Sequence, residues 1–260
     1  MNSAPCKQHI VQLSGGIGSF YAAHRVVKKF GSDNTTLLFA DTKMEDEDLY
    51  RFIKDASDYL KVPITTLCDG RTPWEVFKDK QFLGNTRIDP CSLVLKRELL
   101  WGWIEANAPK DAIVYVGIDW SEEHRLERLR TYRPEFKIES PLLWPPMPEK
   151  PKMLKWCQSI GISIPKLYEL GFSHNNCGGF CIKSGQAQFR LLLSTMPERY
   201  KFHEDQEQAL REYLDKDVSV LRDRRGGKTR PMTLKEFRER IERGEQHDRH
   251  DWGGCGCAIE

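Results

Sequence analysis

Short apolar runs alternate with amphipathic stretches through the first half of this 260-residue chain. The pattern predicts strands at 9–13, 36–40, 63–67 and 112–117, and helices at 20–30, 45–60 and 93–106. Parallel strands need a long crossover, which a helix usually supplies. The alternation therefore predicts an α/β domain in which helices cover a parallel sheet.

The second half of the chain has a different pattern. Five prolines fall within 141–151, where neither a helix nor a strand can continue easily. Beyond them we expect helices only, at 153–170, 185–195, 204–214 and 233–244. We accordingly divide the chain into an α/β domain at residues 1–145 and a smaller helical region at residues 146–260.

Charge and hydropathy limit the functional classes. The net charge of +2 excludes a uniformly basic coat, and no apolar run is long enough to span a bilayer. The chain shows no export signal, so we expect a cytoplasmic protein without a membrane partner. Residues 222–243 carry nine Lys or Arg against four acids. They predict either a surface for the phosphates of tRNA or DNA or a solvated helix face.

A glycine-rich loop lies between the first predicted strand and the first predicted helix. It consists of Ser14, Gly15, Gly16, Ile17, Gly18 and Ser19. Glycines let a backbone approach a phosphate closely, and the amides at a helix start attract anions. The serines add uncharged donors. A tight turn that binds nothing is the alternative, but the context favours a phosphate-binding loop.

Four further motifs follow the loop in order. They are FADT at 39–42 with Glu45, PCS at 90–92 with Leu95 and Lys96, GID at 117–119 with Glu122, Glu123 and Arg125, and LYELGF at 167–172 before Cys177. Together with the loop they resemble the phosphoadenylyl-sulfate (PAPS) reductase-like branch of the adenine nucleotide alpha-hydrolase superfamily, the PP-loop ATP pyrophosphatases. Gly18 stands where ATP-using members commonly carry Asp.

The resemblance implies a Rossmann-like, HUP-type nucleotide-binding domain at residues 1–145. The nucleotide-binding residues that it implies are Ser14, Gly15, Gly16, Gly18, Ser19, Asp41, Thr42, Gly117 and Arg125. The nucleotide is ATP with Mg²⁺, or alternatively PAPS or adenylyl sulfate (APS). Catalytic roles fall on Cys91, Lys96 and Cys255.

Three functions are alternatives for this chain, of which the resemblance implies the first two. The first is ATP-dependent adenylation of a substrate, followed by sulfur transfer to that substrate. Nucleic acid is one candidate substrate. The second is reduction of PAPS or APS. The third is a non-catalytic nucleotide-binding or nucleic-acid-binding module with structural zinc. The enzymatic alternatives imply a sulfur or electron donor protein as a partner, and a homo-oligomer is compatible with each.

Eight cysteines include two close pairs, Cys177 with Cys181 and Cys255 with Cys257. Four converging thiolates suit zinc or an iron–sulfur cluster. The family resemblance favours a [4Fe-4S] cluster and also allows a ligand set of Cys91, Cys177, Cys181 and one tail cysteine. No histidine follows Cys257, unlike in the reductases. Cys6, Cys68 and Cys157 have no such company and are expected to be ordinary residues.

Overall fold

The computed structural model describes residues 7–85 and 88–254, and its main feature is a five-stranded parallel sheet. The strands, in the spatial order β3-β2-β1-β4-β5, are β3 (Ile64–Cys68), β2 (Thr35–Asp41), β1 (His9–Gln12), β4 (Ile113–Tyr115) and β5 (Lys137–Glu139). The predicted parallel α/β fold, with a Rossmann-like strand order, is confirmed. Strand β5 was not predicted, because its three residues are too few to show a period.

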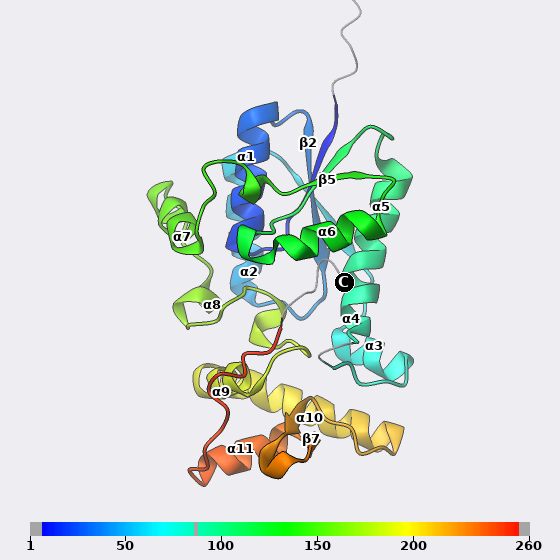
Figure 1. Cartoon of the computed structure of the whole chain (residues 1–260), viewed down its shortest axis with the longest axis vertical. Helices are drawn as coiled ribbons and strands as arrows, with labels where there is room; N and C mark the ends of the chain where they lie inside the picture. Colours follow the sequence, from blue (N-terminus) through cyan, green and yellow to red (C-terminus); the bar gives the residue numbers. More distant parts are fainter. Residues whose placement is uncertain (1–6, 86–87, 255–260) are drawn as a thin grey trace, which may run out of the picture.

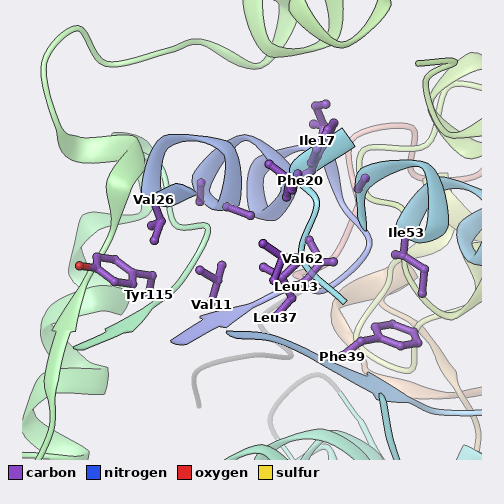
Figure 2. Close-up of a cluster of buried hydrophobic side chains, with 14 of the residues drawn as sticks. Val11, Leu13, Ile17, Phe20, Val26, Leu37, Phe39, Ile53, Val62 and Tyr115 are labelled. Carbon is purple, nitrogen blue, oxygen red and sulfur yellow. The ribbon is translucent and has the colours of Figure 1, made fainter. Parts of the chain in front are cut away.

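Helices cover both faces of this sheet (Figure 1). The core on one face includes residues of α1 (Ile17–Phe30), α2 (Glu47–Leu60) and α7 (Lys150–Ser159), and the core on the other includes residues of α5 (Leu99–Asn107) and α6 (Glu123–Tyr132). Alternate strand residues enter the two cores: Val11 faces the first, shown in Figure 2, and Ile10 the second. This two-residue alternation is what a sheet buried on both faces requires.

Helix α1 begins at Ile17, three residues before its predicted start. Gly18 and Ser19 therefore belong to its first turn, and the loop that connects it to β1 is short. Helix α2 begins after Asp46, whose side chain accepts from the amide of Asp48. The unpredicted helix α3 (Pro73–Asp79) starts with a capping box between Thr72 and Glu75.

The predicted helix at 93–106 is longer and less regular than expected. It begins with α4 (Pro90–Ser92), passes through a π-helical segment at Leu93–Glu98 and continues as α5. Lys96 lies in the π-helical segment. Such wide turns are frequent at functional sites because they redirect side chains.

Two predictions for the second half are wrong. Strands do not stop after residue 151, because β6 (Leu221–Asp223) and β7 (Arg230–Met232) form an antiparallel pair. The predicted helix at 153–170 is interrupted between α7 and α8 (Lys166–Glu169), where Gly161 has a φ of +82° and Pro165 precedes α8. The other helices are α9 (Gln186–Thr195), α10 (Pro197–Leu214) and α11 (Leu234–Glu242).

Elements α8 to α11 and the β6–β7 pair, residues 166–254, are called the cap below (Figure 1). The cap shares a hydrophobic cluster with Met44, Trp74 and Phe77 of the first half. Helix α7 instead contributes Met153 and Cys157 to the first core. The division at residue 145 stays a prediction. Within the described part of the chain, every helix is too short or too polar to act as a membrane span.

Candidate functional site

The main pocket lies at the carboxyl edge of the sheet, where β1 and β4 are neighbours and the chain turns to opposite sides. Ligands of open parallel sheets bind at such a switch point. The pocket is lined from the loop after β1, the segment after β4, the π-helical segment, α7 and the start of the cap. Predicted residues at the pocket are Ser14, Gly16, Gly18, Ser19, Lys96, Gly117 and Arg125.

The two serines of the glycine-rich loop contact each other. The hydroxyl oxygens of Ser14 and Ser19 are 3.2 Å apart, and the Ser14 amide donates to Ser19 Oγ at 3.1 Å. The Ser19 hydroxyl also donates to the carbonyl of Gly16 at 2.9 Å. The residue that precedes helix α1, Gly16, provides no capping side chain, and the first turn of the helix has no acidic residue. Its positive end is therefore arranged to accept an anion.

Gly117 lets the end of β4 approach this loop. A Cβ atom at residue 117 would lie 2.7 Å from the backbone nitrogen and Cα of Ser19. A glycine is therefore needed here for steric reasons, and the predicted contact of Gly117 with the nucleotide stays a prediction. Gly15, in the loop itself, has a φ of +82°, a conformation that favours glycine.

Two residues of the cap form hydrogen bonds with the backbone of the glycine-rich loop and the start of α1, and neither was predicted as a site residue. The hydroxyl of Tyr168 accepts from the amide of Ile17 at 3.1 Å, and Asn175 Nδ2 donates to the carbonyl of Gly15 at 2.8 Å. Asn175 is 1% exposed. Tyr168 belongs to the LYELGF motif, but no periodicity or spacing connects it to a loop 151 residues earlier.

Three cationic side chains, Lys96, Arg125 and Lys150, line the pocket. Arg125 forms an ion pair with Glu122, and its buried Nε has no hydrogen-bond partner within residues 7–85 and 88–254. Lys150 Nζ lies 4.6 Å from the centre of the Tyr168 ring. Burial lowers the pKa of Lys150, and the nearby Asp119 and Glu122 oppose that shift. Lys150 was not predicted, because it lies in the proline-rich segment.

A second, smaller cavity adjoins the pocket and contains the predicted thiols Cys91, Cys177 and Cys181. Lys96 lines both spaces. Its Nζ is 3.9 Å from Cys177 Sγ and 3.4 Å from Glu45 Oε1. The amide of Cys177 also donates to the Glu45 carboxylate. The sheet edge and the cap thus place the thiols beside the pocket.

The predicted metal ligands are only partly described. Among residues 7–85 and 88–254, no group of three His, Cys, Asp or Glu side chains is arranged to hold a metal ion. Cys91, Cys177 and Cys181 therefore line one cavity without forming a metal-binding group. Cys255 and Cys257 lie outside the described residues, so the four-cysteine set stays a prediction. The amide of Gly254, the residue before Cys255, donates a hydrogen bond to the backbone carbonyl of Lys183, which is two residues after Cys181.

Asp41 and Thr42 do not line the main pocket in the described structure. The Asp41 carboxylate accepts from the Tyr50 hydroxyl at 2.7 Å and from the Lys43 amide at 2.8 Å. The Thr42 hydroxyl donates to Glu45, and Thr42 lines the thiol cavity. Cys157, expected to be an ordinary residue, is in the first core, where burial raises its pKa to about 11.

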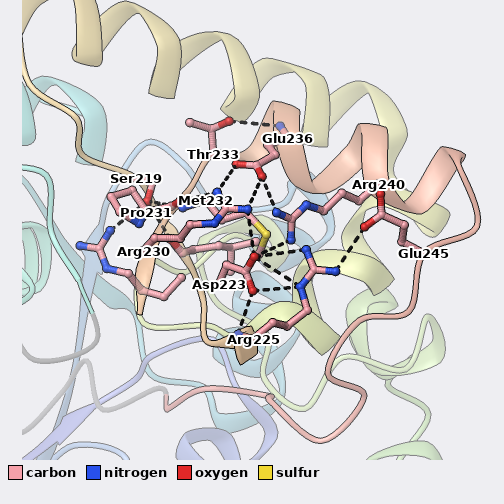
Figure 3. Close-up of polar contacts among 12 residues, drawn as sticks. Ser219, Asp223, Arg225, Arg230, Pro231, Met232, Thr233, Glu236, Arg240 and Glu245 are labelled. Carbon is pink, nitrogen blue, oxygen red and sulfur yellow. Dashed lines mark hydrogen bonds and ion pairs between the residues drawn. The ribbon is translucent and has the colours of Figure 1, made fainter. Parts of the chain in front are cut away.

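Much of the charge of segment 222–243 is neutralised inside the cap. The Asp223 carboxylate accepts from Arg225, Arg230 and Arg240 (Figure 3). Ion pairs involve six of the nine basic residues: Arg224, Arg225, Arg230, Arg238, Arg240 and Arg243. Paired side chains of this kind are expected of a solvated face, the second of the two alternatives for this segment.

Comparison with known proteins gives a distant structural match. No protein-family model matches the chain, and no curated protein matches it. Among solved structures, it is similar to the NH3-dependent NAD synthetase from Campylobacter jejuni subsp. jejuni NCTC 11168, determined in complex with the nitrate ion. The two chains are 14% identical, the match covers 82% of this chain and 86% of that one, and the TM-score is 0.42. The α/β assignment rests on this chain's own strand order and register.

Proposed function

We propose that the pocket binds an adenine nucleotide and that the protein is a PP-loop enzyme that adenylates a substrate with ATP. The observation that carries this proposal is the convergence of the α1 N-terminus, Arg125 and Lys150 on one pocket at the sheet's switch point. Backbone amides and cations together match the several negative charges of a triphosphate. The family resemblance supplies the adenine nucleotide as the ligand class.

In the proposed reaction, an oxygen of the substrate attacks the α-phosphorus of ATP. A new oxygen–phosphorus bond forms as the bond between the α-phosphorus and the bridging oxygen breaks, and pyrophosphate leaves. Lys150 and Arg125 would neutralise charge on the phosphates. Asp119 and Glu122 line the pocket and would offer carboxylate oxygens to Mg²⁺, which proteins commonly hold through one or two carboxylates and substrate phosphates.

The thiol cavity supports sulfur transfer as the second step. A sulfur nucleophile, delivered to a cysteine as a persulfide by a donor protein, would form a carbon–sulfur bond at the adenylated carbon. The carbon–oxygen bond breaks, and AMP leaves with the oxygen. A second thiol of the cavity would then attack the sulfur of the first cysteine, which breaks the sulfur–sulfur bond and releases the product as a thiolate. The resulting cysteine–cysteine disulfide would be reduced by a dithiol donor protein. Lys96 supports this order of events because it lines both the pocket and the cavity of Cys91 and Cys177. An ammonium group near a sulfur favours the reactive thiolate.

Substitution of Gly16 tests the nucleotide proposal. A Cβ atom at residue 16 would lie 3.3 Å from the Tyr168 hydroxyl and 3.7 Å from Ser14 Oγ, so it would crowd the hydroxyl that accepts from the Ile17 amide. We expect Gly16→Ala to weaken ATP binding and pyrophosphate release by about tenfold, or about 1.4 kcal/mol. Gly102→Ala is a matched control, since nothing lies within 4 Å of a Cβ there. Tight ATP binding by Gly16→Ala would contradict the assignment.

Labelled PAPS separates sulfur transfer from the reductase alternative. Sulfite release that depends on Cys255 or Cys257 would identify a reductase, whereas pyrophosphate release from ATP would support adenylation. Metal analysis after anaerobic purification tests the proposed cysteine site. Iron and inorganic sulfide lost together in Cys181→Ser would support a cluster, whereas zinc alone would support the structural alternative.

A further inference from the structure

Gln12 is a buried residue of the pocket wall whose side-chain amide makes no hydrogen bond to the described residues. It is the last residue of β1, is 6% exposed and lines the main pocket. Neither its Nε2 nor its Oε1 has a hydrogen-bond partner in the described part of the chain. Buried amides are nearly always paired, and an unpaired one costs stability. An unpaired buried amide at the wall of a pocket therefore indicates a ligand that forms hydrogen bonds with it.

The neighbouring pocket walls are apolar. They come from alternate residues of β2, Leu38 and Ala40, from Val116 and Ile118 after β4, and from Leu100 of α5. Ile10, two residues before Gln12, belongs to the same hydrophobic cluster as these residues. The strand period therefore directs Gln12 to this face of the sheet. Apolar walls with one donor and one acceptor suit a flat heteroaromatic ring rather than a phosphate.

We propose that Gln12 is the specificity residue that binds the edge of the adenine base, an inference that rests on the nucleotide-binding function proposed above. The amide oxygen accepts from the 6-amino group, and the amide nitrogen donates to the adjacent ring nitrogen. Glutamine forms such paired bonds with adenine because the two edges present complementary groups. The ring lies against the apolar walls, and the phosphates extend to the α1 N-terminus.

The test measures the affinity of ATP and of purine riboside triphosphate, which lacks the 6-amino group, for the full-length protein. Gln12→Met keeps the length of the side chain and removes both polar atoms. We expect it to weaken ATP binding by about tenfold, the size of one or two neutral hydrogen bonds. Purine riboside triphosphate lacks only the partner of the amide oxygen and keeps the ring nitrogen. Its loss in Gln12→Met should therefore be smaller, about threefold.

The melting temperature of the nucleotide-free protein gives a second readout. Gln12→Met should not lower it, because the substitution removes an unpaired buried amide. Gln158→Met makes the same change on the exposed surface of α7 and should alter neither affinity. If Gln12→Met does not fold, Gln12→Leu replaces it in the same measurements.

The outcomes separate this inference from the proposed function. If the unaltered protein binds neither nucleotide, the proposed function itself fails. If it binds ATP and Gln12→Met binds ATP equally well, only the role of Gln12 fails. An equal loss for both nucleotides would show that Gln12 supports the pocket without contacting the 6-amino group, and would also overturn the inference.

Discussion

The edge of the sheet around Gln12 and the Asp223 cluster of the cap both contain buried polar side chains, but only one of them satisfies those groups. Asp223 accepts from three arginines, and its neighbours in the cluster are paired in turn. At the sheet edge, both amide atoms of Gln12 and the Nε of Arg125 have no partner within the described residues. Buried groups that the fold leaves unpaired are the ones available to a ligand. The contrast identifies the pocket as the candidate site and the Asp223 cluster as structural.

The substitution with the largest expected effect tests the structural role of the Asp223 cluster. Asp223→Ala removes the shared acceptor of Arg225, Arg230 and Arg240, and the Arg240 side chain is only 10% exposed. We expect the free energy of unfolding to fall by about 3 kcal/mol, because a buried charge loses a partner. Denaturant unfolding measures this loss. ATP affinity should stay within about twofold, a change of only about 0.4 kcal/mol.

An exposed ion pair in the same cap is the control. Glu242, which pairs with Arg238, is 57% exposed, and Glu242→Ala should cost less than about 1 kcal/mol. Equal losses for the two variants would contradict a structural role specific to Asp223. Hydrogen bonds from Arg225 hold the pKa of Asp223 well below its usual 3.8. The Asp223 contribution is therefore present at neutral pH and is lost as the pH falls below about 3.8.

Glu207 gives the next largest effect and has the opposite dependence on pH. Its carboxylate accepts from the amides of Val220 at 2.7 Å and Leu234 at 2.6 Å, and it is 1% exposed. Glu207→Gln keeps one acceptor and places an amide donor opposite the other N–H group. We expect a cost of about 2 kcal/mol in unfolding free energy.

Burial raises the pKa of Glu207 from 4.5 to about 7. Between these values the folded chain binds more protons at this site than the unfolded chain does, so its stability falls as the pH rises. The stability advantage over Glu207→Gln should therefore be larger at the acid end of this range. Comparing the two proteins at each pH cancels the titration of groups that both contain, such as His203. A pH-independent difference would contradict the raised pKa.

Gly117 tests the ligand side of the comparison. Gly117→Ala would place a Cβ atom 2.7 Å from the backbone of Ser19 and displace the loop. We expect ATP affinity to fall by about tenfold, or about 1.4 kcal/mol. Gly102→Ala in α5 meets no neighbouring atom and should stabilise the helix slightly. Calorimetric titration measures both, and unchanged affinity in Gly117→Ala would separate the loop from nucleotide binding.

Tyr168 gives the smallest expected effect and sharpens the role of the cap. Tyr168→Phe removes the acceptor of the Ile17 amide but keeps the aromatic ring beneath Lys150. We expect a loss of about 1 kcal/mol in unfolding free energy, the size of one hydrogen bond. Hydrogen exchange at the start of α1 should accelerate more than exchange in the middle of α1. Unchanged exchange would indicate that the cap does not hold the loop.

The α/β fold, the place of the loop and most of the helices could be predicted from the amino-acid sequence. These features depend on local spacing: apolar residues at strand or helix periods, glycines at turns and prolines that interrupt elements. The β6–β7 pair was missed because its strands have three residues each and lie in a charged segment without a strand period. The start of α1 was misplaced because Gly18 is a poor indicator of a helix interior.

Which of the polar residues remain available to a ligand depends on the packing of the folded chain. The arginines of segment 222–243 are alike in the sequence, but folding pairs most of them with carboxylates of the cap. Asn175 contacts Gly15 across 160 residues, and Lys150 reaches the same pocket from the end of the proline-rich segment. In the sequence, Gln12 is an ordinary strand residue, and only the structure shows that its side chain is buried at the pocket. Pairing and burial depend on groups brought together by packing, which local spacing does not encode.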